Sequence, residues 1–503
     1  MITIRDALRR LWEAEDSARL LQQDGHWVSW GRVRTLAERL DRELRSAGCD
    51  AGGRVAVVLG NRLESVAALL AIMTGERTLV TISPLQPVER LSADLRASSA
   101  EFVLAPGQCF ASDAFAAALA DLDATAWRLD GDAVERWRAG GAGAGAGQRN
   151  PDVAVEMLTS GTTGPAKRIP LTRRQLEASL TAALQHNDRP DGSERALLTG
   201  TVGFVVLPIV HIGGLWGLLQ CLVTARPFVL LPRFSLSAWR AAVVEHRPGM
   251  VSLPPPALRE VLESDISREE LSSVRAVTAG TSPVEPALVD AFYERFGIPV
   301  LTVYGATEFC GAVAGWTKKD FLSNWSKKKG SVGRAFPGVR LQVVDENGDE
   351  LAPGQTGRLR VATPQAGRDW VTTSDLAHLD EDEYLYIDGR ADDVIVRGGF
   401  KVAPDTVART LRTHPDVRDA AVAGLPDSRL GQIPVAAVEL RPGATVSPQE
   451  LRSHCRSTLT PYEVPAEVYI VDELPRGAAL KVDRQQLIAL LMQRRATGQG
   501  ATA

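Results

Sequence analysis

The stretch from Met157 to Lys167 (MLTSGTTGPAK) constrains this chain more than any other feature of its sequence. It continues a mostly apolar run from Val153 to Leu158, which predicts a buried strand that ends abruptly. Each of the next six residues is a glycine or carries a hydroxyl group. Glycines allow a tight turn that exposes backbone N–H groups, while the hydroxyl groups and the lysine add donors and a positive charge. The pattern therefore predicts a loop that binds a polyphosphate.

This loop differs from the Walker A pattern. That pattern needs Gly-Lys followed directly by Ser or Thr, whereas here Ala166 precedes Lys167 and Arg168 follows it. An ordinary polar loop is the alternative interpretation, and the density of hydroxyl groups and glycines argues against it. The residues expected to contact phosphate are Thr159, Ser160, Gly161, Thr162, Thr163, Gly164 and Lys167.

Length, charge and cysteine spacing limit the class of protein. A chain of 503 residues exceeds a usual single core, so at least two domains are expected. The net charge of -4 gives no reason to expect nucleic acid or an anionic membrane as a partner. Five scattered cysteines without Cys-x-x-Cys spacing argue against a disulfide framework or zinc site and fit a cytoplasmic location. We expect neither a signal peptide nor an integral membrane segment.

Alternating strand-like and helical stretches predict the fold class. Up to about residue 150, and again from Thr172 to Thr302, the alternation indicates βα units around parallel sheets. From Gly338 onward, short alternating strands predict a small β-rich subdomain, and an α+β domain follows. We therefore expect an α/β fold with a large N-terminal domain, residues 1–390, and a small mobile C-terminal domain, residues 391–503. The glycine–alanine run from Ala139 to Gly147 predicts a flexible linker.

Several polar motifs follow predicted strands in the second half of the chain. Tyr304-Gly305-Ala306-Thr307-Glu308 comes directly after a strand-like run, and its carboxylate is a hard oxygen ligand of the kind that Mg²⁺ prefers. The carboxylate of Asp375, in Thr373-Ser374-Asp375, can accept hydrogen bonds from two hydroxyl groups at once. Arg390, in Asp388-Gly389-Arg390, carries a permanent positive charge. Lys481 lies near the C-terminus, directly before a predicted helix.

Together these motifs resemble those of the adenylate-forming, or AMP-binding, superfamily, and in particular its acyl-CoA and aryl-CoA synthetases. The resemblance extends from about Leu20 to about Leu491. It implies ATP, Mg²⁺ and coenzyme A as ligands. In the nucleotide site, it implies that Tyr304 packs on adenine, that Thr307 contacts the α-phosphate and that Glu308 binds Mg²⁺.

The resemblance also implies how the rest of the nucleotide is held. Gly280, Thr281 and Ser282 would line the adenine, although the family's usual residues in this turn are glycine, alanine and proline. Asp375 would hold both ribose hydroxyls, with Ser374 replacing the usual glycine. Arg390 would lie near the ribose and the phosphates.

Further motifs imply a catalytic lysine on a domain that moves. Lys481 matches the catalytic lysine, although Leu480 stands where the family usually has glycine. Asp392 falls at the hinge position. Gly398 and Gly399 match the loop that lines the thiol tunnel in CoA ligases.

The segment from Pro208 to Leu215 resembles the acyl-binding motif, in which His211 would gate the acid pocket. Amino-acid-activating relatives place an aspartate in this region, but Val205 to Leu219 contains no carboxylate. Since a buried ammonium without a counter-charge is costly, we expect a fatty or aromatic acid without an α-amino group.

The resemblance thus implies an ATP-dependent carboxylic acid–CoA ligase that forms an acyl-AMP intermediate. Two alternatives keep the adenylation and change the acceptor: an amide synthetase and a carrier-protein loader. A third is a non-catalytic nucleotide-binding protein, against which the retained Glu308, Asp375, Arg390 and Lys481 argue. The identity of the acid stays open, as does a homodimer.

Overall fold

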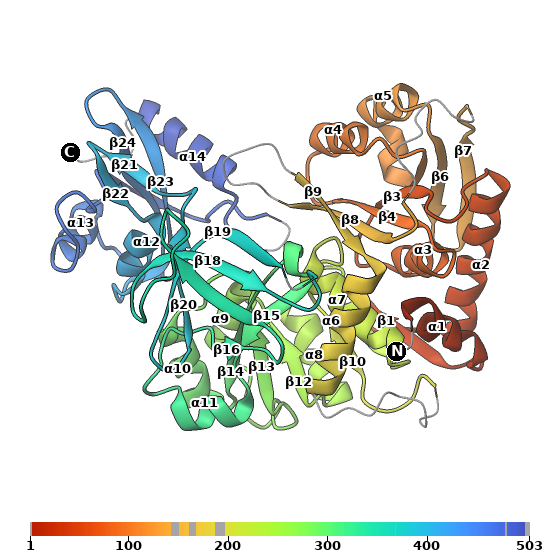
Figure 1. Ribbon diagram of the computed structural model, residues 1–503, viewed down its shortest axis with the longest axis horizontal. Helices are drawn as coiled ribbons and strands as arrows, with labels where there is room; N and C mark the ends of the chain where they lie inside the picture. The colour runs from red at the N-terminus through yellow and green to blue at the C-terminus, as the bar shows by residue number, and fades with distance from the viewer. Residues whose placement is uncertain are drawn as a thin grey trace.

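The computed structural model describes residues 3–141, 150–159, 167–186, 197–367, 369–477 and 480–497. Within these ranges the strands form five sheets. Figure 1 shows a large N-terminal part and a smaller C-terminal part, coloured blue, at the upper left. The small part combines strands and helices. The expected α/β fold, with a large N-terminal domain and a small α+β C-terminal domain, is therefore confirmed.

The first sheet has seven strands in the order β7-β6-β5-β3-β4-β8-β9. Neighbours from β6 to β8 are parallel, whereas β7 and β9 are antiparallel edge strands. Parallel neighbours need crossover connections, which helices supply here. The bounds are β3 (Arg54–Val58), β4 (Thr78–Ile82), β5 (Phe102–Pro106), β6 (Thr125–Asp130), β7 (Ala133–Arg138), β8 (Val153–Thr159), β9 (Lys167–Thr172), α2 (Trp30–Ser46), α3 (Leu63–Thr74), α4 (Val88–Ser98) and α5 (Asp113–Asp121).

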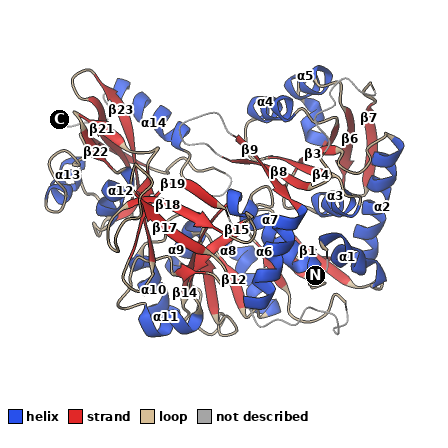
Figure 2. Ribbon diagram, viewed as in Figure 1, coloured by secondary structure: helices blue, strands red, loops and turns tan. Residues whose placement is uncertain are grey.

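Both faces of this sheet are covered. Val55 and Val57 of β3 pack into the core that contains α2 and α3, whereas Ala56 and Val58 pack into the core that contains α4 and α5. Successive strand residues face opposite sides, and Figure 2 shows the two helix pairs on opposite sides of the sheet. This arrangement explains why β3 is a nearly continuous apolar run.

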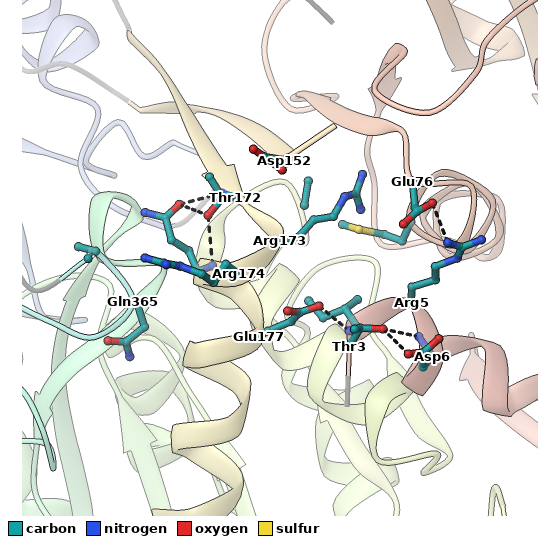
Figure 3. Close-up of a pocket in the computed structure, with 16 residues that line it drawn as sticks. Thr3, Arg5, Asp6, Glu76, Asp152, Thr172, Arg173, Arg174, Glu177 and Gln365 are labelled. Atoms are coloured by element: carbon teal, nitrogen blue, oxygen red, sulfur yellow. Dashed lines mark hydrogen bonds and ion pairs between the residues drawn. The ribbon is translucent and has the colours of Figure 1, made fainter. Parts of the chain in front are cut away.

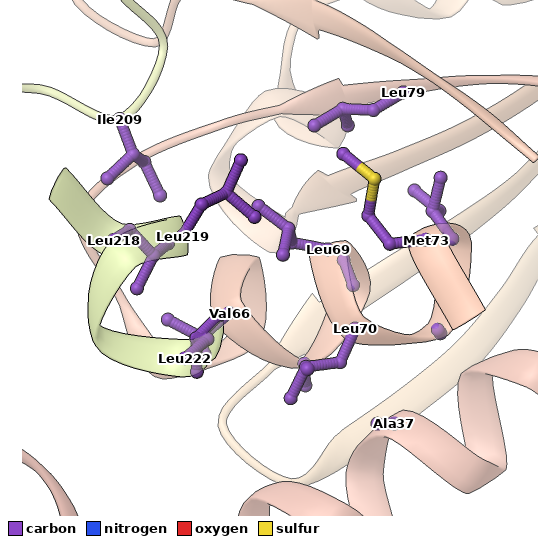
Figure 4. Packing of buried hydrophobic residues seen from close by; sticks show 14 of the residues in the cluster. Ala37, Val66, Leu69, Leu70, Met73, Leu79, Ile209, Leu218, Leu219 and Leu222 are labelled. Carbon is purple, nitrogen blue, oxygen red and sulfur yellow. The ribbon is translucent and has the colours of Figure 1, made fainter. Parts of the chain in front are cut away.

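Helix α3 is buried along almost its whole length and joins the sheet to α7 (Ile212–Val223). Figure 4 shows Leu69 and Met73 of α3 packed near Leu79 of β4, with leucines of α7 on the other side. Because α7 begins directly after His211, this packing fixes the position of His211 relative to the sheet.

Two further sheets complete most of the large part, in the orders β12-β13-β14-β15-β16 and β10-β11-β1-β2. In the first, β12, β13 and β14 are parallel, and β15 and β16 are antiparallel additions. The strands are β1 (Arg19–Gln23), β2 (His26–Ser29), β10 (Gly203–Val205), β11 (Phe228–Leu230), β12 (Met250–Ser252), β13 (Ala276–Ala279), β14 (Val300–Ala306), β15 (Gly311–Gly315) and β16 (Arg334–Ala335). The helices are α1 (Ile4–Arg9), η1 (Arg10–Glu13), η2 (Gly107–Ala111), α6 (Arg173–His186), α8 (Leu236–His246), α9 (Pro255–Glu263), α10 (Pro286–Phe296), η3 (Thr307–Phe309) and α11 (Lys318–Asn324).

One strand suggested by local sequence is wrong. The apolar run from Ala196 to Thr199 reads as a strand, but its described residues, 197–199, form a turn instead. Leu198 has a φ of +58°, which is incompatible with an extended strand. Apolar character alone could not reveal this turn.

The β-rich subdomain is an antiparallel meander of β17 (Arg340–Val344), β18 (Gly357–Ala362), β19 (Trp370–Leu379) and β20 (Leu385–Arg390). The longest of these strands, β19, contains Thr373-Ser374-Asp375. The pairing of β18 with β19 shifts its register at this point, because Arg358 pairs with Leu376 but Arg360 pairs with Thr372. The motif is therefore a bulge within a strand.

The C-terminal sheet has the order β22-β21-β24-β23, and β25 pairs with β24. Its elements are β21 (Ile395–Arg397), β22 (Phe400–Val402), α12 (Pro404–Arg412), β23 (Val417–Asp427), β24 (Gly431–Leu440), α13 (Pro448–Arg456), β25 (Glu467–Val471) and α14 (Arg484–Thr497). The meander ends at Arg390 and this sheet begins at Ile395, while a domain boundary at 390/391 stays a prediction. Among the described helices, none is both long and apolar enough to cross a membrane.

Candidate active site

Three strands bring Asp375, Tyr304 and Arg390 together. In the β19–β20 pairing, Asp375 lies directly opposite Arg390. The Tyr304 hydroxyl, from the end of β14, donates to Asp375 Oδ2 at 2.5 Å, and Arg390 Nη1 lies 3.5 Å from Asp375 Oδ1. Burial and the Asp375 charge both raise the pKa of Tyr304, so the phenol stays protonated and keeps its role as donor. A carboxylate with a tyrosine and an arginine around it suits a sugar hydroxyl pair.

The bulge in β19 explains the direction of the Asp375 side chain. Thr373 Oγ1 accepts a hydrogen bond from the Asp375 amide at 3.0 Å and donates to the Leu359 carbonyl at 2.9 Å. Ser374 Oγ accepts a hydrogen bond from Arg390 Nη2. Bulges commonly re-aim side chains beside active sites. Ser374, a departure from the family pattern, therefore helps to hold Arg390 in place.

Arg390 also forms a two-point ion pair with Asp392, the predicted hinge residue. Its Nε and Nη2 atoms lie 2.9 Å from Asp392 Oδ1 and Oδ2, respectively. These hydrogen bonds raise the pKa of Arg390. The neighbouring Asp393 pairs with Arg484 at the start of α14. The segment between the two parts of the chain is thus tied to both of them in this arrangement.

Lys481 is close enough to this group to interact with its charges. Burial lowers the pKa of Lys481, the Asp375 carboxylate opposes that shift, and the Arg390 charge adds to it. The lysine side chain is nevertheless accessible to solvent. A ligand could therefore reach Lys481 from solvent while the lysine still interacts with Asp375 and Arg390.

His211 connects the same neighbourhood with α7. Burial and the nearby charge of Lys481 lower the pKa of His211 to about 4, so its imidazole is neutral at pH 7. Its Nε2 atom is buried and has no hydrogen-bond partner in the described part of the chain. Buried polar atoms usually have partners. The unpaired nitrogen therefore fits a site that a bound molecule completes.

Thr281 supplies a second buried polar atom without a partner. Its Oγ1 makes no hydrogen bond within the ranges that the structure describes. A Cβ added at Gly213 would lie 3.8 Å from Thr281 Cγ2, so Thr281 borders the start of α7. Its φ of +70° is an outlier for a β-branched residue. Strained residues of this kind occur at ligand sites.

Gly280 and Glu308 lie at the ends of neighbouring strands, β13 and β14. A Cβ at Gly280 would lie 2.8 Å from Val303 Cγ2, so glycine permits this close approach. Ser282 follows in the same turn and is half-buried. Thr307 and Glu308 begin η3, in which the Glu308 side chain is exposed and Phe309 is buried. An exposed carboxylate at this strand end fits Mg²⁺ held jointly with phosphates.

The phosphate-loop prediction is described only at its two ends. Strand β8 ends at Thr159, which pairs with Lys167 at the start of β9, so the predicted buried strand is confirmed. Ser160, Gly161, Thr162, Thr163 and Gly164 lie outside the described residues, as does most of the predicted linker from Ala139 to Gly147. Contact of this loop with phosphate stays a prediction.

The structure does not bring Gly398 and Gly399 to the Lys481 group. They form the turn between β21 and β22, with φ values of +57° and +90°. The next residues contact other surfaces, because Phe400 stacks on Tyr462 and Lys401 Nζ lies 3.0 Å from Glu346 Oε1. This turn therefore faces the C-terminal domain's own surface and the β-rich subdomain.

A cavity of about 750 Å³ lies apart from all of these residues (Figure 3). It is bordered by α1, the start of α6 and the loop around Gln365. Its lining mixes basic and acidic side chains, namely Arg5, Arg173, Arg174, Asp6, Glu76, Asp152 and Glu177. No predicted site residue is among them, and this mixture selects no charge type of ligand. The chemistry is therefore better placed at the Asp375–Lys481 group.

Sequence reasoning missed the residues that hold the Lys481 turn. The backbones of Arg476 and Val482 form an isolated antiparallel β-bridge. Nη1 of Arg476 lies 3.3 Å from the Leu480 carbonyl oxygen, and the Gly477 amide donates to the Lys481 carbonyl at 2.7 Å. Arg476 is itself paired with Asp419 of β23. The Leu-Pro-Arg sequence before the lysine was the available signal, but Asp419 is distant in sequence.

Comparison with known proteins shows that two family models match most of this chain. A family model described as AMP-binding enzyme matches residues 9–369, and one described as AMP-binding enzyme C-terminal domain matches residues 407–481. The chain is 31% identical to a sulfoacetate–CoA ligase from Cupriavidus necator, over 94% of each chain.

Solved structures of similar proteins share the fold. An o-succinylbenzoate CoA synthetase from Bacillus subtilis, in complex with ATP and magnesium ion, is 25% identical, with a TM-score of 0.78 over 96% of this chain and 98% of that one. An amide bond synthetase from Marinactinospora thermotolerans is also 25% identical, with a TM-score of 0.78 over 97% and 99% of the two chains. Because the first family model spans well over half of its length, this chain belongs to the AMP-binding enzyme family.

Proposed function

We propose that this protein is an ATP-dependent carboxylic acid–CoA ligase that forms an acyl-AMP intermediate. The observation that carries the proposal is that Lys481, near the C-terminus, lies within electrostatic reach of Asp375, Arg390 and His211, which come from three other segments. The presence of ATP and magnesium ion in the structure of a similar synthetase supports the same assignment.

In the first half-reaction, the substrate carboxylate attacks the α-phosphate of ATP, the bond to the β-phosphate breaks, and pyrophosphate leaves. Asp375 holds the ribose hydroxyls, with Tyr304 and Arg390 orienting its carboxylate. The Lys481 ammonium lies between the carboxylate and the α-phosphate, where it stabilises the negative charge that develops in the transition state. Glu308 would hold Mg²⁺, which neutralises charge on the phosphates.

The acid would occupy the space beside His211 and Thr281. Their Nε2 and Oγ1 atoms, which have no hydrogen-bond partner in the described ranges, offer the polar contacts that orient the carboxylate or a second polar group on the acid. A neutral imidazole adds no charge to this pocket, and α7 begins there with apolar residues. This environment favours a fatty or aromatic acid over an amino acid.

In the second half-reaction, the CoA thiol attacks the acyl carbonyl carbon and AMP leaves. We propose that the C-terminal domain first turns about Asp392, which withdraws Lys481 and brings Gly398 and Gly399 to the acid. Glycines at this turn let a narrow pantetheine arm pass close to the backbone. The positive φ values of both residues are compatible with that role.

A panel of aliphatic and aromatic acids tests the proposal. Each acid is incubated with ATP, Mg²⁺ and CoA, and the formation of AMP and of the CoA thioester is measured. We expect equal amounts of AMP and thioester with at least one acid. Acid-dependent pyrophosphate exchange without any thioester would exclude the CoA ligase.

A second candidate function is an amide synthetase, which one specific observation favours: the structural similarity to an amide bond synthetase over nearly the whole chain. The same adenylate would then be attacked by an amine nitrogen instead of the CoA thiol. Repeating the panel with simple amines in place of CoA distinguishes the two functions, because only one acceptor should give product at a useful rate.

A further inference from the structure

An ionic chain runs from the large N-terminal part of the protein to the turn that carries Lys481. Its members are Glu285, Arg412, Asp419 and Arg476. Glu285 directly precedes α10 in the N-terminal part, and its side chain makes no capping hydrogen bond to the described helix. Arg412 ends α12, Asp419 lies in β23 and Arg476 precedes the lysine turn, so these three belong to the C-terminal part.

The links of this chain are short. Arg412 Nε lies 3.1 Å from Glu285 Oε1 and 2.8 Å from Asp419 Oδ1. The other oxygen of Asp419 pairs with Arg476. Arg476 in turn donates to the Leu480 carbonyl, which belongs to the residue directly before Lys481. Every step from α10 to the lysine turn is therefore a charged or hydrogen-bonded contact.

Partial burial makes these contacts stronger than ordinary surface pairs. The four side chains are only 16–21% exposed. Burial alone would raise the pKa of Asp419, but the charges of Arg412 and Arg476 outweigh it and lower that pKa. Asp419 is thus held as an anion between two arginines. Salt screens such partly buried pairs less than exposed ones.

The lysine turn depends on this support because its backbone is strained. Leu480 has a φ of +59°, a conformation that glycine adopts readily and leucine does not. Such a residue persists only where surrounding contacts hold it. Arg476 provides them from one side, through the Leu480 carbonyl and the bridge to Val482.

We infer that Glu285 is a positioning residue for adenylation: through Arg412, Asp419 and Arg476 it holds the Lys481 turn in the arrangement that faces Asp375 and His211. This inference rests on the proposed two-step function. Three members of the chain move together with the C-terminal domain. Among the contacts that link these four described residues, the Glu285–Arg412 pair is the one that crosses to the N-terminal part, so it must break before the domain can turn for the thiol step.

Removal of Glu285 leaves two positive charges facing each other. Arg259 of α9 lies 3.4 Å from Glu285 Oε2, whereas Arg412 contacts the other carboxylate oxygen, Oε1. Without the carboxylate between them, the two guanidinium groups repel, which pushes the C-terminal domain away. The effect should therefore exceed the loss of a single attractive pair.

Another residue of the protein, outside this series of ion pairs, offers a matched control. Glu263, at the end of α9, also contacts the C-terminal part, at 3.6 Å from Arg418 and 3.5 Å from Arg441. These contacts are longer, more exposed, and unconnected to Arg476 by any contact within the described ranges. Exposed pairs of this kind contribute little. Glu263→Gln removes a crossing carboxylate without touching the lysine turn.

The test separates the two half-reactions. For Glu285→Gln we expect acid-dependent ATP–pyrophosphate exchange to fall about tenfold, in line with the loss of a partly buried charge pair. Conversion of supplied acyl-AMP to the thioester should be unchanged or faster. Glu285→Asp should restore part of the exchange, and Glu263→Gln should retain the wild-type rate. Equal losses in both half-reactions, or equal losses in the two Gln variants, would overturn the inference.

A second measurement needs no turnover. The five native cysteines are buried, so dyes can be attached selectively at Leu322→Cys and Met492→Cys, two exposed positions on α11 and α14. We expect Glu285→Lys to shift the distance between the dyes, whereas Glu263→Lys leaves it unchanged. An unchanged distance in Glu285→Lys would refute the positioning role. Failure of wild-type exchange with every acid would instead refute the proposed function.

Discussion

Thr281→Gly should make the protein more stable and less active. Thr281 combines two unfavourable features, a left-handed backbone with φ +70° and a buried hydroxyl oxygen that has no hydrogen-bond partner among the described residues. Glycine removes both, because it has no Cβ and no hydroxyl group. If these features were retained for substrate binding, their removal should raise the free energy of unfolding while weakening catalysis.

The expected magnitude is a gain of about 1 kcal/mol. Relief of the left-handed conformation contributes roughly 1–2 kcal/mol, and removal of the unpaired hydroxyl contributes about 1 kcal/mol. Against this, the lost methyl group costs about 0.8 kcal/mol, and the extra chain entropy of glycine costs about 0.5–1 kcal/mol. Thr281→Ala keeps the backbone strain but lacks the hydroxyl, so its stability should be close to that of the wild type.

Thermal unfolding and steady-state kinetics of the two variants test this reasoning. The midpoint of Thr281→Gly should rise by about 2 °C. Both variants should lose about fivefold in kcat/KM for the acid, the size of one neutral hydrogen bond. A lower midpoint for Thr281→Gly than for Thr281→Ala would refute the strain argument. Full activity in both variants would refute a role for the hydroxyl.

Three other predictions concern the catalytic lysine, the hinge and the buried histidine. Lys481→Ala should reduce acid-dependent ATP–pyrophosphate exchange about 10²–10³-fold yet still convert supplied acyl-AMP to thioester; normal exchange would contradict the assignment. Asp392→Pro should slow the thiol step more than adenylation, and equal slowing in both steps would remove the hinge argument. Because burial lowers the pKa of His211 to about 4, the unfolded chain binds the extra proton between pH 6.5 and 4. The free energy of unfolding of the wild type should therefore decrease as the pH is lowered from 6.5 to 4. The decrease should be smaller in His211→Gln, and urea unfolding at several pH values measures both.

Local sequence predicted those elements that are nearly continuous in apolar residues. Apolar runs at 54–59, 63–73 and 79–82 predict a strand, a helix and a strand, and the observed β3, α3 and β4 differ from these ranges by at most one residue at each end. The turn at Leu198 was missed, since a positive φ leaves no trace in an apolar pattern. No strand was predicted at β19, where a bulge interrupts the alternation of its residues.

The candidate site was predictable where one motif carries both a residue type and its place at a strand end. Asp375 and Arg390 are an example, because they were expected in one site and lie opposite each other in β19 and β20. The supports of the lysine turn were not predictable in this way. Asp419 and Glu285 are ordinary acidic residues in sequence, and only the folded chain shows that they flank Arg412.

Three of the eleven non-glycine residues with positive φ in the described part of the chain lie at this site. Thr281, Cys310 and Leu480 all have positive φ values, and each stands within three residues of a proposed contact for nucleotide, metal or acid. At two of these positions, 281 and 480, the residue departs from the smaller one usual in the family. A relaxed glycine would let the turn sample several conformations, whereas a strained side chain held by its neighbours allows one. The departures therefore favour a preorganised site, in which the Lys481 turn is fixed by Arg476 rather than by the freedom of glycine.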